Sequence, residues 1–393
     1  MSTTALPSRV HEAPHKVSPG LWALAWQRLR ADAVGMVSLV IVAAFLIMVA
    51  LSATGLLAKD WAREVGVNYA PPTFLGPQAP DVFNAPGTQG GTPAAPASEF
   101  KSSVVDPLAE DIAALKGGAP AGASPSPPLS PSDDAKAIDP LADVMADINA
   151  KQGKTTASAE ARAATLPLGA DKWGRDVLKK TIKGSETSIF VGLASAVLAT
   201  FIGTVMGAFA GYYGRWVDDF FNWLYSVFSS IPYLLLILAV AAVLQQKGTM
   251  TIILILGLTG WSGVFRLIRG EYLKHKGREY VQAADAIGAS NPRRMFVHIL
   301  PNVSHVVLVQ LSILAVAFIK SEVILSFLGF GVPVDVVSWG SMLNEAQNEL
   351  ILGKWWQLAA AGTAMALLVT AFSLFTDALR DALDPKLRGR AGL

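Results

Sequence analysis

Long stretches without charged side chains alternate with short charged ones along this chain, and they predict membrane-spanning helices. Three of these runs, at 33–58, 187–214 and 220–246, contain 26, 28 and 27 residues without a single Asp, Glu, Lys, Arg or His. About 20 consecutive apolar residues are needed to cross the hydrocarbon core of a bilayer. The three runs therefore predict three spans, the first of which we place at 33–57.

Three shorter or less uniform segments complete the predicted set. Residues 248–265 form an uncharged run of 18 residues, and residues 355–376 form one of 22. A further segment, from about 303 to 325, is apolar but contains Lys320 and Glu322 near its end. We therefore predict an all-α polytopic membrane protein with six transmembrane helices.

The distribution of Lys and Arg predicts the orientation of these spans. With the N-terminus in the cytoplasm, the inside segments hold 16 Lys and Arg residues and the short outer loops hold 3. Cytoplasmic loops are enriched in basic residues. We therefore expect residues 1–32, 214–219, 266–302 and 377–393 to lie in the cytoplasm. The first apolar run is too long for a cleaved signal peptide, so we expect it to be retained.

Composition supports a membrane protein and narrows its partners. Hydrophobic residues make up 52% of the chain and charged residues 16%, against about 25% charged in an ordinary soluble domain. The net charge of +2 is too small to indicate a nucleic-acid partner. The chain has no cysteine, which excludes disulfides and thiolate metal sites.

The segment between the first two spans, 58–165, is expected to lie outside the cytoplasmic membrane. Its part at 71–134 is rich in Pro, Gly, Ala and Ser, a composition that buries too little apolar surface to fold, so we expect it to be largely disordered. Two pieces, 104–118 and 137–153, share the tetrapeptide DPLA and the Asp cap, first-turn Pro and apolar stripe of short helices. They are interpreted either as docking helices or as a duplicated spacer.

Residues 279–302, EYVQAADAIGASNPRRMFVHILPN, interrupt the apolar pattern on the expected cytoplasmic side. Their apolar positions predict a short helix over 278–287 that Gly288 ends. Asn291 and the proline after it start a second helix, which we expect Pro301 to end just before the next span. Taken alone, these features also fit a surface-lying amphipathic segment in any polytopic protein.

The same segment resembles the cytoplasmic EAA loop of ABC importer permeases, which reads Glu-Ala-Ala, three residues, Gly and, about a dozen residues later, Leu-Pro. The positions that match are Ala283, Ala284, Gly288, Leu300 and Pro301. Gln282 stands where the general pattern has Glu, and His298 stands where it has Ile. These departures resemble the dipeptide, oligopeptide and nickel branch of the family.

Three further stretches resemble the same branch. They are LGADKWGRDVLKKTIKGSETSIFVGL at 168–193, SEVILSFLGFGVPVDVVSWGSML at 321–343 and TDALRDALDPKLRGR at 376–390. In the second, Asp335 and Val336 interrupt the family's usual proline region. The resemblance covers residues 20–57 and 166–390 and is to the C-type permease subunits. It leaves out 58–165, which is longer than the family's outer segment.

The resemblance implies a multi-pass subunit of a bacterial inner membrane that has no cofactor and is not itself an enzyme. Its implied partners are a second homologous permease, two ABC ATPase subunits, an extracytoplasmic substrate-binding protein and membrane lipid. No P-loop sequence for binding nucleotide occurs in the chain, so ATP hydrolysis is expected of the partners. The expected organisation is a cytoplasmic N-terminal segment, the first span, an outer insert, a permease domain and a cytoplasmic tail, at 1–32, 33–57, 58–165, 166–376 and 377–393.

The resemblance also assigns site residues. The loop that couples to an ATPase, within 266–302, is implied to act through Glu279, Tyr280, Gln282, Ala283, Ala284, Gly288, Ala289, Ser290, His298, Leu300 and Pro301. Two polar residues at the end of the fifth span are candidates for the translocation path or its gate, namely Glu322 and Ser326.

Other classes of function receive less support from the residues. A secondary transporter or channel usually carries ionisable side chains at mid-membrane, and the second, third, fourth and sixth predicted spans have none. His298 and His305 are seven residues apart, but Pro301 intervenes and no third ligand is near, so no metal site is expected. No nucleophile and base constellation indicates a membrane enzyme. Peptides are the favoured substrate, with nickel or another small solute as the alternative.

Overall fold

The computed structural model describes residues 21–77 and 162–383, which belong to one compact unit. The two DPLA segments and most of the Pro-rich stretch lie outside the described residues. Within those that are described, the structure is helical, and extended backbone pairs only at isolated bridges. This confirms the all-α class.

Four helices are long and apolar enough to cross a membrane. They are α2 (Ala33–Ala53), α5 (Val177–Tyr213), the continuous helix Asn291–Phe327 and α14 (Trp356–Leu383). Two bent pairs pass the same test together: α6 (Arg215–Ser229) with α7 (Tyr233–Leu244), and α8 (Thr249–Thr259) with α9 (Ser262–Lys276). Counting each bent pair as one span gives six among the described residues, in the order that the sequence predicts.

The third predicted span is not one continuous helix. The sequence predicts an uninterrupted run over 220–246, whereas the axes of α6 and α7 meet at 85°. The break falls at Ser230–Pro232, because proline has no N–H to donate and disfavours helical backbone at the residue before it, here Ile231.

Helix α5 lies against α9, α12 (Leu300–Phe327) and α8. Its contact with α9 depends on glycines spaced four residues apart, Gly203, Gly207 and Gly211. A β-carbon on each would lie 2.6 to 2.8 Å from a backbone carbonyl of the segment Trp261–Arg269. Small residues at this spacing let two helix backbones approach closely inside a membrane. Larger side chains here would force the two helices apart.

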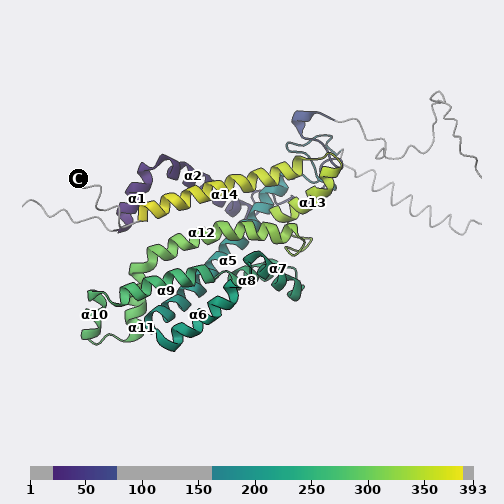
Figure 1. The fold of residues 1–393 in the computed structure, drawn as a ribbon. Helices are drawn as coiled ribbons and strands as arrows, with labels where there is room; N and C mark the ends of the chain where they lie inside the picture. The colour runs from purple at the N-terminus through teal and green to yellow at the C-terminus, as the bar shows by residue number, and fades with distance from the viewer. Residues whose placement is uncertain (1–20, 78–161, 384–393) are drawn as a thin grey trace, which may run out of the picture. The chain divides into compact units, whose positions relative to one another are not determined.

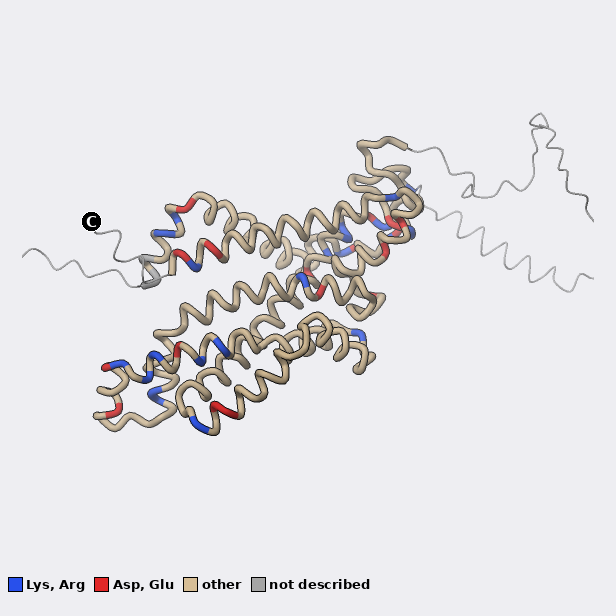
Figure 2. The backbone as a smooth tube through the Cα atoms, in the orientation of Figure 1, with Lys and Arg blue, Asp and Glu red and all other residues tan. Residues whose placement is uncertain are grey.

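The segments that the sequence places on one side of the membrane gather at one end of the helices (Figure 1). Helix α1 (Leu21–Ala31), α10 (Glu279–Ala286) and the end of α14 lie there, while α13 (Trp339–Ile351) and η1 (Thr73–Leu75) lie at the other end. Most positions coloured as Lys, Arg, Asp or Glu along the backbone lie toward the two ends (Figure 2). The arrangement agrees with the expected topology, and the assignment of the α10 end to the cytoplasm stays a prediction from the basic residues.

Both described ends of the outer insert pack together. Bridges join Gly66 to Ala163 and Pro72 to Leu166, and Glu64 to Arg175 next to the start of α5. A β-carbon on Gly174, whose φ is +80°, would clash with the carbonyl of Gly66. The outer ends of the first and second spans are therefore fastened to each other by ordered backbone.

Candidate functional site

The EAA-like segment forms a helix, a turn and a second helix. Helix α10 ends at Ala286, and Gly288 follows with a left-handed φ of +84°. The N–H of Gly288 donates to the carbonyl of Asp285 at 2.8 Å, and the N–H of Ala289 donates to that of Ala284 at 3.0 Å. These bonds satisfy carbonyls at the helix end, as a glycine at this position commonly allows. The predicted helix end at Gly288 is confirmed.

The expected helix end at Pro301 is wrong. The helix runs without a break from Asn291 to Phe327, through α11 (Asn291–Arg293), the π-helical turn η2 (Arg294–Ile299) and α12. In η2 the N–H of Leu300 donates to the carbonyl of Met295, five residues back. Such a widened turn makes room for a proline inside a helix. The side-chain amide of Asn302 also donates to the carbonyl of His298 at 2.7 Å.

The sequence-predicted coupling residues differ in how far they are exposed. Ala284 and Val281 of α10 are both buried, and Val281 packs in a core cluster with Met295 and Ile299. The small side chain of Ala284 therefore faces the interior of this chain. The exposed ones are Glu279, Tyr280, Gln282, Ala283, Gly288, Ser290 and Pro301. The partly exposed ones are Ala289, His298 and Leu300.

One exposed residue at this tip was not among the sequence-predicted site residues. Ile287 caps the C-terminal end of α10, and 84% of its side chain is exposed. The sequence predicts a helix that includes Ile287, whereas α10 ends one residue earlier and leaves this side chain exposed. Ile287 and Gly288 thus present an apolar, sterically open tip, since nothing lies within 4 Å of a β-carbon placed on Gly288.

Hydrogen bonds fasten this segment to two spans. The Tyr212 hydroxyl at the end of α5 donates to Asn291 Oδ1 at 3.0 Å, and the Tyr272 hydroxyl of α9 donates to the carbonyl of Met295 at 3.2 Å. Arg294 pairs with Asp285 of α10. These contacts, with the continuous helix from Asn291 to Phe327, connect α10 to α5, α9 and α12.

The two gate candidates lie together at the far end of α12. The Ser326 hydroxyl donates to Glu322 Oε1 at 2.6 Å, and both residues are buried. Glu322 Oε2 has no hydrogen-bond partner among the described residues. Glu322 is fully enclosed by protein, so in this conformation it lines no open path.

A buried ionic network next to these residues was not predicted from the sequence. Lys180 of α5 donates to Asp171 Oδ2 at 2.8 Å, to Glu345 Oε2 at 2.5 Å and to Gln357 Oε1 at 3.2 Å. Glu349 of α13 lies beside the network, and neither of its carboxylate oxygens has a hydrogen-bond partner among the described residues. Burial, with smaller contributions from Asp171 and Glu345 against the lowering effect of Lys180, raises the pKa of Glu349 to about 7.

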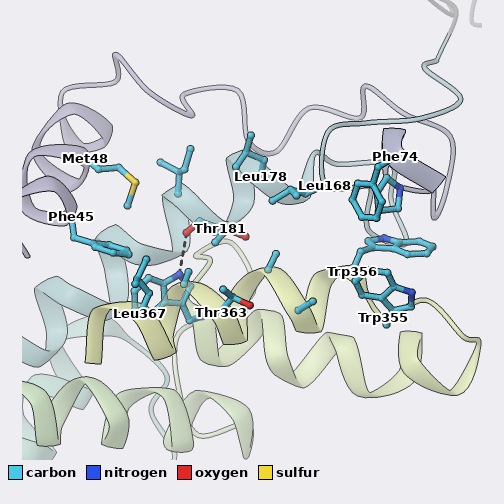
Figure 3. Close-up of a pocket in the computed structure, with 16 residues that line it drawn as sticks. Phe45, Met48, Phe74, Leu168, Leu178, Thr181, Trp355, Trp356, Thr363 and Leu367 are labelled. Atoms are coloured by element: carbon cyan, nitrogen blue, oxygen red, sulfur yellow. Dashed lines mark hydrogen bonds between the residues drawn. The ribbon is translucent and has the colours of Figure 1, made fainter. Parts of the chain in front are cut away.

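A separate hollow of about 410 Å³ opens between α2, α14 and the start of α5. Figure 3 shows its almost entirely apolar walls, with Phe45 and Met48 on one side and Phe74, Trp355 and Trp356 at the outer end. Polar groups that would orient a solute do not converge on it. Aromatic side chains at one end of the spans are typical of residues that meet the lipid headgroup region.

Two family models match this sequence. The model described as binding-protein-dependent transport system inner membrane component matches residues 203–389. The model described as N-terminal TM domain of oligopeptide transport permease C matches residues 20–72. The second match extends beyond the resemblance at 20–57 and includes most of the ordered outer segment that packs against residues 162–176.

Several curated proteins are similar over most of their length. The dipeptide transport system permease protein DppC of Bacillus subtilis is 38% identical over 57% of this chain and 71% of its own length. The oligopeptide transport system permease protein OppC of the same organism is 37% identical over 56% of this chain and 72% of its own. OppC of Haemophilus influenzae is 35% identical, over 56% and 70% respectively.

Proposed function

Because this chain belongs to the family of inner-membrane permease components of binding-protein-dependent ABC transport systems, we propose that it imports peptides together with a second, homologous permease. It is a multi-pass protein of the bacterial inner membrane. In the proposed complex the two permeases enclose the path, two ATPase subunits bind below them and a substrate-binding protein delivers cargo from outside. The permease itself catalyses no reaction, and the ATPase subunits hydrolyse ATP.

The geometry of the α10–η2 segment supports the coupling part of this proposal. Its tip at Ile287 and Gly288 is exposed, apolar and sterically open, which suits insertion into a groove on another protein. Its base is fastened to α5 and α9 and continues into α12. Closure of an ATPase dimer against this tip would thus move three spans as packed bodies.

Peptides are the proposed cargo because the similar proteins are named for dipeptide and oligopeptide transport. The apolar hollow in Figure 3 is assigned to membrane lipid rather than to cargo, since its walls offer no converging polar groups.

The test replaces Gly288 in the complex reconstituted into lipid vesicles with its binding protein. Gly288→Val meets nothing within the chain itself, but a β-branched residue at a left-handed φ costs roughly 1 kcal/mol or more and enlarges the tip. We expect normal assembly with the sister permease, and a sharp loss of peptide uptake and of ATP hydrolysis stimulated by loaded binding protein.

Gly288→Asn is the matched control, because asparagine tolerates left-handed backbone, and it should lose less activity. Full stimulated activity in Gly288→Val would remove the coupling role from this segment. Absence of ATP-dependent peptide uptake by the wild-type complex would overturn peptide import.

A further inference from the structure

A small hollow of about 150 Å³, lined by polar and apolar side chains, lies next to α13. In Figure 1, α13 is at the end of the helices opposite α10. The walls of the hollow come from the start of α5, from the turn between α7 and α8, from the loop that joins α12 to α13, and from α13 itself. The polar residues that line it are Arg175, Lys180, Lys247, Ser326, Ser341, Asn344 and Glu345.

Basic side chains outnumber acidic ones in the lining of this hollow, where Arg175, Lys180 and Lys247 stand against Glu345. Lys180 is engaged with Asp171 and Glu345. Arg175 and Lys247 form no ion pair among the described residues, and the buried Nε of Arg175 has no acceptor there. Two cationic side chains, Arg175 and Lys247, therefore line the hollow and have N–H donors available for a bound anion.

The guanidinium of Arg175 is also held in place. It lies over the ring of Trp61 at 5.6 Å and over that of Trp173 at 6.0 Å. Cation–π contacts of this kind orient an arginine without using its N–H donors. The planar fork of donors on an arginine matches a carboxylate, which it binds through two hydrogen bonds.

We propose that this hollow binds the free α-carboxylate of a peptide as it enters from the binding protein, with Arg175 and Lys247 as the binding groups. This inference rests on the peptide import proposed above. The volume is well below that of sites which enclose a whole small ligand, so it suits one end of a chain. Its inner wall is Ser326, which is hydrogen-bonded to Glu322 inside α12, so a bound group would touch a span rather than a peripheral surface.

The test compares one radiolabelled tripeptide as the free acid and as the C-terminal amide. Uptake of both forms is measured in vesicles that contain the complete complex and its binding protein. In the wild type we expect the free acid to be taken up faster at equal concentrations. In Arg175→Gln and in Lys247→Gln we expect the ratio of the two rates to fall about tenfold, the effect of losing one charged hydrogen bond.

Two variants keep the test independent of folding. Lys247 is exposed, so its replacement leaves the packing intact even if Arg175→Gln misfolds. Lys179→Gln is the matched control, because Lys179 lies at the same end but pairs with Asp60 on the exposed surface. It should keep the wild-type ratio.

Each other outcome counts against the site. A wild-type ratio near one, or an unchanged ratio in both Arg175→Gln and Lys247→Gln, would show that this hollow does not recognise the carboxylate. Equal loss of uptake for acid and amide would indicate docking of the binding protein instead. If wild-type vesicles take up neither form with ATP, peptide import itself fails, and this inference fails with it.

Discussion

Arg294 and Asp285 form an ion pair across the turn between α10 and η2, with Nη1 and Oδ1 2.5 Å apart. Nη2 of the same arginine donates to Asn291 Oδ1 at 2.5 Å, and the guanidinium lies 5.9 Å from the centre of the Tyr212 ring. A single side chain thus connects the short helix, the turn and the end of α5. The rigidity of the proposed coupling segment depends on this connection.

We expect Arg294→Met to uncouple transport from ATP hydrolysis while the complex still assembles. The methionine keeps apolar contact with Tyr212 but loses the bonds to Asp285 and Asn291, so α10 can move without moving α5. Peptide uptake per ATP hydrolysed should fall severalfold in reconstituted vesicles.

Asp285→Asn is the control for Arg294→Met, because it removes only the ion pair. The Asp285 carboxylate is largely exposed, so the loss in stability should be about 1 kcal/mol or less. Equal uncoupling by both variants would place the connection in the ion pair alone, and unchanged coupling in Arg294→Met would contradict a rigid segment.

Ile287→Ser should weaken binding of the ATPase subunits without affecting the fold. The side chain is 84% exposed in the single chain, and burying an isoleucine against a partner contributes about 1.5 to 3 kcal/mol. Affinity should therefore fall roughly tenfold to a hundredfold, measured by titrating purified ATPase subunits onto immobilised permease pair. Ile351→Ser, at a position 83% exposed on α13, is the matched control and should bind normally.

The spans could be predicted from hydropathy, but the start of α5 could not. Helix α5 begins at Val177, after Asp176 accepts a hydrogen bond from the N–H of Leu178, ten residues before the uncharged run. Its first turns carry Lys179, Lys180 and Lys183, which a hydropathy pattern assigns to a loop. Lys183 pairs with Glu186 on the next turn. Lys179 and Lys180 pair with Asp60 and Glu345, which are distant in the sequence and which only the tertiary structure brings near.

The EAA-like motif identified the candidate coupling segment but not the direction in which its residues point. Adjacent alanines have opposite surroundings, with Ala283 exposed and Ala284 buried. The helix end expected at Pro301 was wrong for a different reason. A proline favours a helix end, whereas the π-helical turn before this one keeps the helix continuous. Tertiary contacts decide which alanine is buried, and the widened backbone turn decides the continuity at Pro301.

The orientation can be tested with single cysteines, since the chain has none. Ser290→Cys at the α10 turn should resist a membrane-impermeant thiol reagent in intact cells and react after permeabilisation. Ile351→Cys at the opposite end should react in intact cells. Both residues are exposed in the single chain, so protection reports the membrane rather than burial. The reverse labelling pattern would invert the topology.

Glu349 should make stability fall as pH rises through neutrality. Its pKa is about 7 in the folded protein, against 4.5 for an unperturbed glutamate, so between these values the folded state holds a proton that the unfolded state has released. Stability therefore decreases with rising pH across this window and levels off above it. At pH 8 the folded protein carries an ionised, buried carboxylate without hydrogen-bond donors among the described residues.

Glu349→Gln isolates this contribution from the other titrating groups. At pH 4.5 the variant and the wild type should unfold at similar temperatures in detergent. At pH 8 the variant should be more stable, by up to roughly 3 kcal/mol for the shift involved, because a neutral amide avoids the cost of burying charge. A wild-type minus variant difference that stays constant between these pH values would show that Glu349 titrates alike in the folded and unfolded states. In that case Lys180, which lowers this pKa, would offset the effect of burial.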